Sequence, residues 1–221
     1  MAVMILKWCL EHTHFKMEFS EKMYLKLMET MFNRYYPKNW IVSVITWITD
    51  SNFRKQKRIT KFLEEQINNP TDRLRKLGIE FRQYSDLNKR IIEILRWVKN
   101  RIVYMSDEAN FKKVEYWATA DETLTRGYDD CDGMNGLIYV LARLSGIPRF
   151  LIYCVLGDTN AGFHFYCLYL NTDTGFVHPI DSTYNIDLNY MKKRKQYLIN
   201  YNGYRGINYV FNDKFSFKQR R

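Results

Sequence analysis

The sequence predicts an α+β fold, with helices in the first two thirds of the chain and an antiparallel sheet after them. Amphipathic helical patterns recur between residues 20 and 144. Residues 150–181 instead alternate between segments rich in β-branched and aromatic residues and turns that contain glycine. A run of helices followed by a run of strands is typical of α+β domains. The 221 residues, 46% of them hydrophobic, suffice for one large domain or a domain with a helical extension.

Helical periodicity dominates the N-terminal part of the chain. Residues 20–36 predict a first helix, because apolar side chains recur on one face and Pro37 stops it. Residues 40–48 form a short apolar stretch that is ambiguous between helix and strand. A second helix is expected over residues 59–67, and residues 71–85 are expected to form a short helix and a linker.

Two further helices are expected before the sheet begins. The stronger pattern runs from about residue 88 to residue 104. Residues 105–130 are mostly polar and are expected to be irregular. A helix over residues 131–144 should follow. Gly146 suits a left-handed cap after it, and Pro148 cannot continue it.

Three strands joined by tight turns are expected after the last helix. Residues 150–156, 163–170 and 176–181 are rich in β-formers, and the segments between them contain glycine and asparagine. The C-terminal residues 200–217 carry several Tyr, Asn and Gly and are expected to form loops with one or two edge strands. The predicted sheet is therefore an antiparallel meander.

Positive charge is gathered in clusters. The formal charge of +10 results from 34 Lys and Arg against 24 Asp and Glu. Such clusters suit an acidic partner protein, anionic lipid or nucleic acid, although a solvated surface gives the same pattern. No recognisable nucleic-acid-binding motif accompanies them, so we expect no nucleic-acid partner. The clusters are Arg54, Lys55, Lys57 and Arg58; Lys192, Lys193, Arg194 and Lys195; and Lys218, Arg220 and Arg221.

The four cysteines, Cys9, Cys131, Cys154 and Cys167, are too few for a disulfide scaffold. A disulfide between Cys154 and Cys167, on neighbouring predicted strands, stays open as an alternative. No Cys-x-x-Cys pair occurs and no cysteine and histidine have zinc-finger spacing, so we expect neither a metal nor a cofactor. No segment approaches the roughly 20 apolar residues of a membrane span, and no secretory leader is recognisable. We therefore expect a soluble cytoplasmic protein.

One cysteine, Cys131, is expected where a loop becomes a helix. There the free backbone N–H groups and the helix dipole favour a thiolate, so we expect a thiol pKa below the free value of about 8.5. His164 is expected near the start of the second strand and Asp181 at the end of the third. Adjacent antiparallel strands would bring these two together, as base and orienting carboxylate of a cysteine nucleophile. A structural cysteine and a core histidine are the alternative.

Short motifs surround these residues in a defined order. A Glu-Thr-Leu segment precedes an Asp-Cys-Asp-Gly segment, the helix then ends in a Ser-Gly-Ile-Pro turn, and a strand histidine and an Asp-x-Thr segment follow. The segments are Glu122-Thr123-Leu124, Asp130-Cys131-Asp132-Gly133, Ser145-Gly146-Ile147-Pro148, Gly162-Phe163-His164 and Asp181-Ser182-Thr183. Over about residues 88–185, this order resembles the transglutaminase-like cysteine peptidase superfamily.

The resemblance implies a papain/transglutaminase-like core, in which the helix that begins at Cys131 packs on an antiparallel sheet. Residues 88–221 would form the catalytic domain, and residues 1–87 a helical region that packs on the core or on a partner. The thiolate would attack an amide or ester carbonyl of a protein or peptide to give a thioester acyl-enzyme. Hydrolysis of peptidase or isopeptidase type is expected, since no amine pocket is recognisable. Acyl transfer and a non-catalytic binding or assembly module are the alternatives.

The sequence departs from the superfamily pattern beside the nucleophile. Asp129 stands where a glycine is usual, and we expect it to face solvent or a basic partner. Nearby negative charge disfavours a thiolate, but Asp132 is expected to point away from the cleft. Trp117 and Asp130 are candidates for the oxyanion or cleft side of the site, although Trp117 equally suits packing and Asp130 suits a helix cap. His178 is expected on the opposite face of its strand, as a surface histidine.

Overall fold

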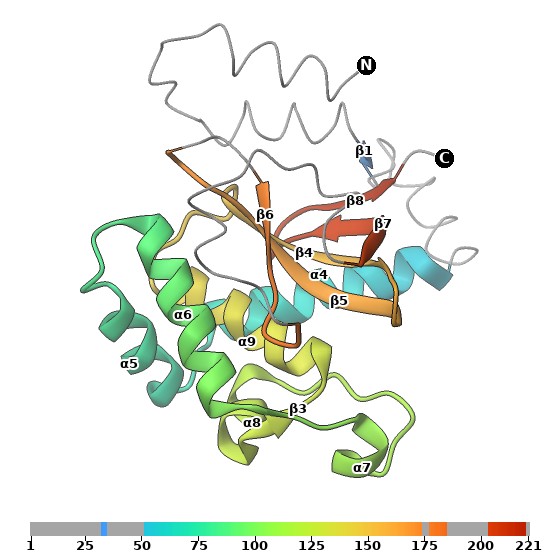
Figure 1. Ribbon diagram of the computed structural model, residues 1–221, viewed down its shortest axis with the longest axis horizontal. Coiled ribbons are helices and arrows are strands. Elements are labelled where there is room, and N and C mark those ends of the chain that lie inside the picture. Colours follow the sequence, from blue (N-terminus) through green and yellow to red (C-terminus); the bar gives the residue numbers. More distant parts are fainter. Residues whose placement is uncertain (1–31, 35–50, 174–176, 185–202, 220–221) are drawn as a thin grey trace, which may run out of the picture.

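The computed structural model describes residues 32–34, 51–173, 177–184 and 203–219. At its centre lies helix α9 (Cys131–Leu144), which contacts the main sheet as well as helices α5 and α6 (Figure 1). Within the described residues, no helix is long and apolar enough to cross a membrane. Helices followed by an antiparallel sheet confirm the predicted α+β class.

Several helix boundaries agree with the sequence prediction. Helix α4 ends at Asn68, and α9 begins at Cys131 and ends at Leu144. Gly146 follows α9 with a φ of 90°, a left-handed conformation that glycine adopts without strain. The helices that precede α9 are α4 (Ser51–Asn68), α5 (Asp72–Phe81), α6 (Leu87–Arg101), α7 (Asp107–Phe111) and α8 (Ala120–Arg126).

The region expected to be irregular, residues 105–130, contains two helices, so that prediction is wrong. The side chain of Thr119 accepts a hydrogen bond from the Glu122 N–H at 3.2 Å, and the Glu122 carboxylate accepts one from the Thr119 N–H at 2.7 Å. This capping box starts α8, and Gly127 ends it with a φ of 76°. The Thr-x-x-Glu spacing was visible in the sequence as a helix-start signal.

Helix α6 is also shorter than predicted. It ends at Arg101, and strand β2 (Val103–Tyr104) then pairs in parallel with strand β3 (Tyr128–Asp129). The β-branched and aromatic side chains of β2 suit this extended conformation. The pairing holds the end of α6 beside the segment that leads directly into α9.

The main sheet has six strands in the order β1-β8-β7-β4-β5-β6, all antiparallel neighbours. The predicted meander forms its β4-β5-β6 half. Strand β7 lies between β4 and β8, so the prediction of only edge strands near the C-terminus is wrong. The strands are β1 (Phe32–Arg34), β4 (Ile152–Thr159), β5 (Gly162–Leu170), β6 (Val177–Ile180), β7 (Tyr204–Phe211) and β8 (Ser216–Gln219).

The first predicted helix does not reach residue 36. Phe32–Arg34 is extended and pairs with β8, because the backbone groups at the edge of β8 offer hydrogen bonds that a helix cannot use. The rest of the predicted helix and the apolar stretch 40–48 lie outside the described residues, as does the basic cluster at 192–195.

One hydrophobic core joins the helices to the sheet. Helix α9 is buried nearly all round, with Leu137, Ile138 and Val140 fully inaccessible. Side chains of α4 and α5, among them Leu63 and Leu74, belong to the same core cluster. Residues 51–81 thus pack on the helix that carries Cys131, while the division of the chain at residue 87 stays a prediction.

A buried carboxylate fixes the C-terminal hairpin to α9. Asp213, between β7 and β8, accepts a hydrogen bond from the Tyr139 hydroxyl at 2.6 Å and forms an ion pair with the Arg143 guanidinium at 3.2 Å. Arg149 pairs with its other oxygen at 3.3 Å. A buried carboxylate is stable only when such partners replace water. The contact therefore sets where β7 and β8 join the sheet.

Close packing of α5 against the end of α9 gives a first prediction. A Cβ on Gly78 would lie 2.6 Å from the Leu144 Cβ, so Gly78→Ala should lower the free energy of unfolding by about 1–3 kcal/mol. Gly136→Ala is the matched control, because nothing lies within 4 Å of its added Cβ and alanine favours a helix. Urea unfolding of both variants checks this, and a Gly78→Ala protein as stable as the control would contradict it.

Candidate active site

Cys131 is the first residue of α9, and its position follows from the local sequence. Asp130 caps the helix by accepting a hydrogen bond from the Asp132 N–H at 3.1 Å. The Cys131 side chain is half-buried against the core. No described residue accepts a hydrogen bond from the Cys131 N–H, so this backbone donor stays available beside the thiol.

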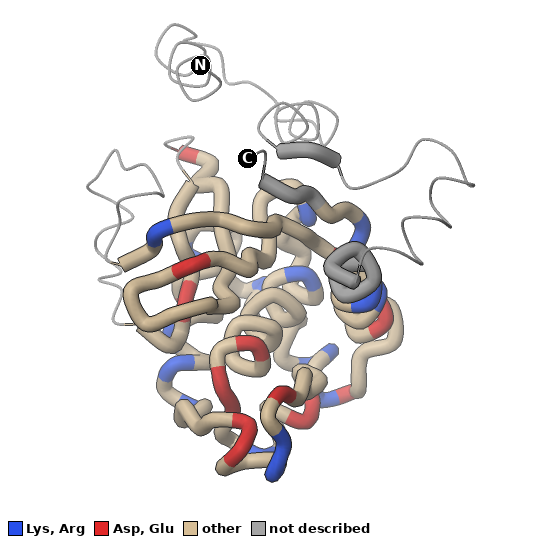
Figure 2. Tube along the Cα trace, turned by 90° about the vertical axis from the view of Figure 1, so that its right-hand side faces the viewer, with Lys and Arg blue, Asp and Glu red and all other residues tan. Residues whose placement is uncertain are grey.

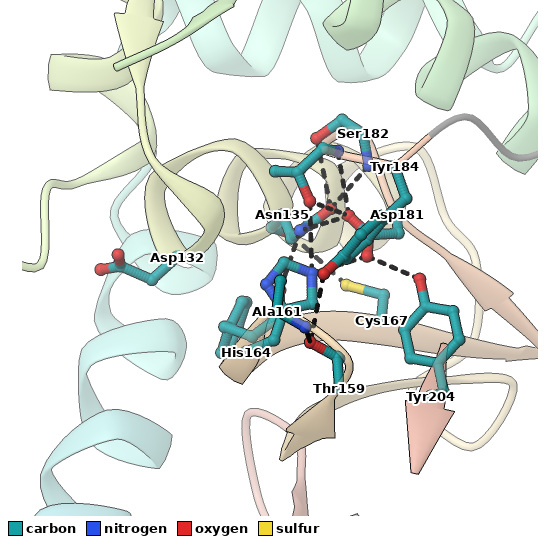
Figure 3. A network of polar contacts seen from close by, with 12 residues as sticks. Asp132, Asn135, Thr159, Ala161, His164, Cys167, Asp181, Ser182, Tyr184 and Tyr204 are labelled. Atoms are coloured by element: carbon teal, nitrogen blue, oxygen red, sulfur yellow. Dashed lines mark hydrogen bonds and ion pairs between the residues drawn. The ribbon is translucent and has the colours of Figure 1, made fainter. Parts of the chain in front are cut away.

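His164 and Asp181 form a buried pair. His164 lies near the start of β5, and Asp181 directly follows β6, the strand beside it. The His164 Nε2 atom lies 2.7 Å from the Asp181 Oδ2 atom (Figure 3), and the two side chains are 9% and 0% exposed. The structure therefore brings together two of the three residues predicted from the motifs, with the carboxylate on one ring nitrogen.

The Asp181 carboxylate accepts five hydrogen bonds. Besides His164, it accepts from the Tyr204 hydroxyl at 2.6 Å, from the Asn135 amide at 3.0 Å, and from the N–H and hydroxyl of Thr183 at 2.9 and 2.7 Å. Burial alone would raise its pKa. The bonds from His164, Tyr204 and Thr183 outweigh burial and hold the pKa of Asp181 below its usual range. Asp181 is thus an ionised group aimed at the imidazole.

Asn135 links the three elements of the site. It lies on α9, one turn after Cys131, and its amide donates to the Phe165 carbonyl of β5 at 2.9 Å as well as to Asp181. Its side-chain oxygen accepts from the Ser182 N–H at 3.0 Å (Figure 3). The sequence reading missed Asn135. A polar residue four positions after the cysteine, on a helix face that is otherwise apolar, was the available signal.

The Cys131 thiol lies against strand β5, but its pKa differs from the prediction. The Phe165 N–H, next to His164 in β5, forms a hydrogen bond to the thiol, and the charge of Asp181 acts on it. Burial, followed by the charges of Asp130, Asp132 and Asp181, raises the thiol pKa well above its usual range. The expected lowering of the pKa is therefore wrong, because the helix terminus is worth less than desolvation beside several carboxylates.

Asp129 is buried, which contradicts its expected exposure. It is 0% exposed and accepts from the Thr123 hydroxyl at 2.6 Å and from the Asp130 N–H at 3.0 Å. A side chain at Gly133 would lie 2.1 Å from the Asp129 carboxylate, so the glycine makes room for it. Burial raises the pKa of Asp129 to about 6. Asp129 therefore serves as an internal brace between α8 and α9.

Acidic residues gather at the end of the molecule that holds α7, α8 and the start of α9 (Figure 2). Carboxylate oxygens of Asp107, Asp129 and Asp130 lie within 4.8 Å of one another, as do ligand atoms of Asp130, Cys131 and Asp132. Carboxylates at such spacing suit a divalent cation. The capping and bracing bonds of Asp129 and Asp130 account for their positions without one.

Asp132 points away from the His164–Asp181 pair, as expected (Figure 3). Burial and the neighbouring Asp130 raise the pKa of Asp132 far above its usual range. His178, by contrast, is only 2% exposed and lies opposite Tyr169 in the sheet, so the expectation of a surface histidine is wrong. The third strand is buried on both faces, and sequence alternation cannot reveal this.

The cleft candidate Trp117 packs edge-on against Phe165, with ring centroids 5.4 Å apart. Its indole N–H donates to the exposed carboxylate of Glu115 at 3.0 Å. This geometry favours the packing interpretation of Trp117. A second aromatic residue near the thiol, Tyr104, was missed by the sequence reading. It pairs with Asp129 across β2 and β3 and is 58% exposed.

Cys154 and Cys167 face each other across β4 and β5 and are both free thiols. Their side chains are fully buried, and the Cys167 thiol donates to the Asn135 carbonyl at 3.4 Å. The structure therefore contradicts the alternative of a disulfide between Cys154 and Cys167. Of the three cysteines described, Cys131 alone is partly exposed.

No protein-family model and no curated protein matches the sequence. Solved structures do match. EGTA-treated LapG from Legionella pneumophila has a TM-score of 0.50 at 12% identity, covering 73% of this chain and 86% of LapG. The chain has a papain/transglutaminase-like fold. A second structure of LapG and calcium-bound LapG give TM-scores of 0.47 and 0.45 at 11% and 13% identity, covering 72% and 81% of this chain and 87% and 88% of LapG.

Burial of Asp129 predicts a pH dependence of stability. Its pKa of about 6 in the folded protein exceeds its ordinary value of 3.8. The folded state thus binds the proton more tightly than the unfolded state does. The titration of Asp129 should therefore make the free energy of unfolding roughly 2–3 kcal/mol lower at pH 7 than at pH 4. In Asp129→Asn this decline between pH 4 and pH 6 should vanish, as measured by urea unfolding across pH.

Thr123→Val provides the internal control for this prediction. The Thr123 hydrogen bond stabilises the charged carboxylate, so its loss should move the decline to higher pH. Parallel pH profiles for the wild type and Asp129→Asn would show that the carboxyl group does not titrate as an isolated buried acid.

Proposed function

We propose that this chain is a cysteine-nucleophile amide hydrolase of peptidase or isopeptidase type, with Cys131, His164 and Asp181 as its triad. The observation that carries the proposal is the buried His164–Asp181 pair, 2.7 Å apart, at the strand ends that face the start of the Cys131 helix. A papain/transglutaminase-like fold and the hydrogen bond of Phe165 to the thiol support the same arrangement. A protein or peptide is the substrate that this chemistry suits.

The hydrogen bonds assign the proton positions on the imidazole. The ionised Asp181 only accepts, so the Nε2 atom of His164 carries the hydrogen in their bond. The Nδ1 atom then has the lone pair and can act as the base. Because burial and the nearby carboxylates raise the thiol pKa, the sulfur carries its proton at rest. His164 therefore takes the proton as the sulfur attacks.

The reaction proceeds through a thioester. The sulfur adds to the substrate carbonyl carbon while the thiol proton moves to His164, and Asp181 stabilises the imidazolium that forms. His164 then gives the proton to the leaving nitrogen, the C–N bond breaks, and an amine departs. Water, deprotonated by His164, attacks the thioester to release a carboxylic acid and restore the thiol. Attack by an amine in place of water would give acyl transfer.

The developing oxyanion needs a donor, and the Cys131 N–H is our candidate. The neighbouring amides of Asp130 and Asp132 already donate to carboxylates, whereas the Cys131 N–H has no acceptor among the described residues. Asp130 acts as the helix cap in this proposal and supplies no donor. Trp117 would have to leave Glu115 to assist, a small cost for an exposed bond.

A non-catalytic binding or assembly module on the same fold is the second candidate. The raised thiol pKa and the carboxylates around Cys131 favour it, because both disfavour a thiolate. The first candidate requires proton transfer to His164 during attack, and the second requires no reaction at all. Acyl-enzyme formation therefore separates them.

Acyl-enzyme formation gives the third prediction. With p-nitrophenyl acetate, the wild type should release one equivalent of nitrophenol in a burst and show an acetyl group on Cys131 by peptide mass spectrometry. His164→Ala and Asp181→Asn should lower the acylation rate by roughly 10²–10⁴-fold, and Cys131→Ala should abolish the burst. A burst of equal size in Cys131→Ala, or none in a folded wild type, would favour the binding module.

The raised thiol pKa gives the fourth prediction. At pH 7, iodoacetamide should modify Cys131 more than about tenfold more slowly than free cysteine, because less thiolate is present. Asp130→Asn retains a good helix cap and removes a negative charge near the sulfur, so it should speed the reaction. Peptide mapping after timed labelling measures both rates. An apparent pKa below about 8.5 in the labelling of Cys131 would contradict this prediction and would support the pKa lowering expected at a helix N-terminus.

A further inference from the structure

A cavity of about 390 Å³ lies between α5, α6 and α8, in the helical part of the molecule away from β7 and β8 (Figure 1). It shares no lining residue with the candidate active site. Its apolar lining comes from Leu77 and Trp97, which are half-buried, and from Ile102 and Leu124, which are buried. Cavities of this volume accommodate small ligands or the side chains of a peptide.

Three cations surround this apolar lining. Arg73, Lys76 and Arg101 are exposed, and none of them forms an ion pair with any residue that the structure describes. The Arg73 guanidinium donates to the Leu124 carbonyl at 3.4 Å, and the Arg101 guanidinium lies 5.4 Å from the Trp97 ring centroid. Both guanidinium groups are therefore held in place, and each still has N–H groups that can donate hydrogen bonds to a ligand. Glu80 is the single carboxylate among the lining residues.

Spacing along α5 explains how charged and apolar groups meet here. Arg73, Lys76, Leu77 and Glu80 follow one another at helical intervals and share one face. Such a face would normally be solvated throughout. Here it borders buried Ile102, so an occupant gains from both apolar contact and charge pairing.

We propose that this cavity binds an acidic peptide segment of a partner protein. An aromatic or aliphatic side chain of the segment packs on Leu77, Trp97 and Leu124, while flanking carboxylates pair with the surrounding cations. Guanidinium groups bind carboxylates through paired hydrogen bonds. These cations are distinct from the basic clusters that suggested an acidic partner from the sequence, and the proposal does not depend on the triad.

Charge and shape favour this occupant over other anions. A free phosphate would use the cations and leave the apolar lining empty. A nucleic acid would need an open aromatic face for stacking, but Trp97 has Arg101 over its ring and packs perpendicular to the Phe81 ring, with centroids 6.2 Å apart.

Binding of a designed probe tests the proposal. The probe is a fluorescein-labelled peptide of about ten residues, with one phenylalanine between glutamates and aspartates, followed by fluorescence anisotropy with the full chain. Lys76→Glu and Arg101→Glu should each raise the Kd at least about tenfold. Arg75→Glu is the matched control, since Arg75 lies on the same helix, is exposed, and does not line the cavity. It should change the Kd less than about threefold.

Further measurements with the same probe distinguish an acidic peptide from other ligands of the cavity. A probe with serine in place of phenylalanine should bind at least about tenfold more weakly; equal binding would reduce the cavity to a simple anion site. Displacement by millimolar inorganic phosphate, tighter binding of oligo-dT, or equal weakening by Arg75→Glu would overturn the proposal. Lys76 makes no hydrogen bond or ion pair with the described residues, so its variant keeps the test valid if Arg101→Glu fails to fold. Cys131→Ala should bind the probe normally, which separates this site from the proposed activity.

Discussion

The fold depends on a polar contact near the start of an apolar helix. Asn135 projects from α9 where its neighbours are hydrophobic, and a buried amide is tolerated only when its hydrogen bonds are made. They are made to Phe165 of β5 and to Asp181 and Ser182 after β6. Apolar packing alone would allow α9 to slide or rotate on the sheet, since such contacts are not directional. The amide bonds fix one position, and the same position brings Cys131 close to the start of β5.

A second polar contact acts at the other end of the helix. Asp213 accepts from Tyr139 and pairs with Arg143, so the β7–β8 hairpin is tied to the last turns of α9. Strand β7 in turn carries Tyr204, whose hydroxyl donates to Asp181 at 2.6 Å. The C-terminal hairpin therefore completes the surroundings of the His164–Asp181 pair, although it is remote from both residues in the sequence.

The sequence was informative where local signals decide the structure. The bounds of α9 follow from Cys131, Gly146 and Pro148, and the β4-β5-β6 meander follows from β-formers and glycine turns. The sequence was uninformative where partners distant in the chain decide. Nothing around residue 204 marks β7 as an internal strand, because its place depends on pairing with β4. Asp129 reads as a surface acid until Thr123 and Gly133 are seen to enclose it.

The same limit explains why the thiol pKa was predicted in the wrong direction. A helix terminus is a local feature worth about 0.3–1 kcal/mol, and the sequence shows it directly. Desolvation depends on the packing of α9 against the sheet, which the sequence does not show, and it is the largest effect on Cys131. Because the thiol is neutral at rest, the imidazole must remove its proton during the proposed attack. The imidazole can take up this proton because the ionised Asp181 stabilises the imidazolium that forms. The hydrogen bonds from His164, Tyr204 and Thr183 keep Asp181 ionised despite full burial. The proposed chemistry thus depends on the bonds around a carboxylate that never touches the substrate.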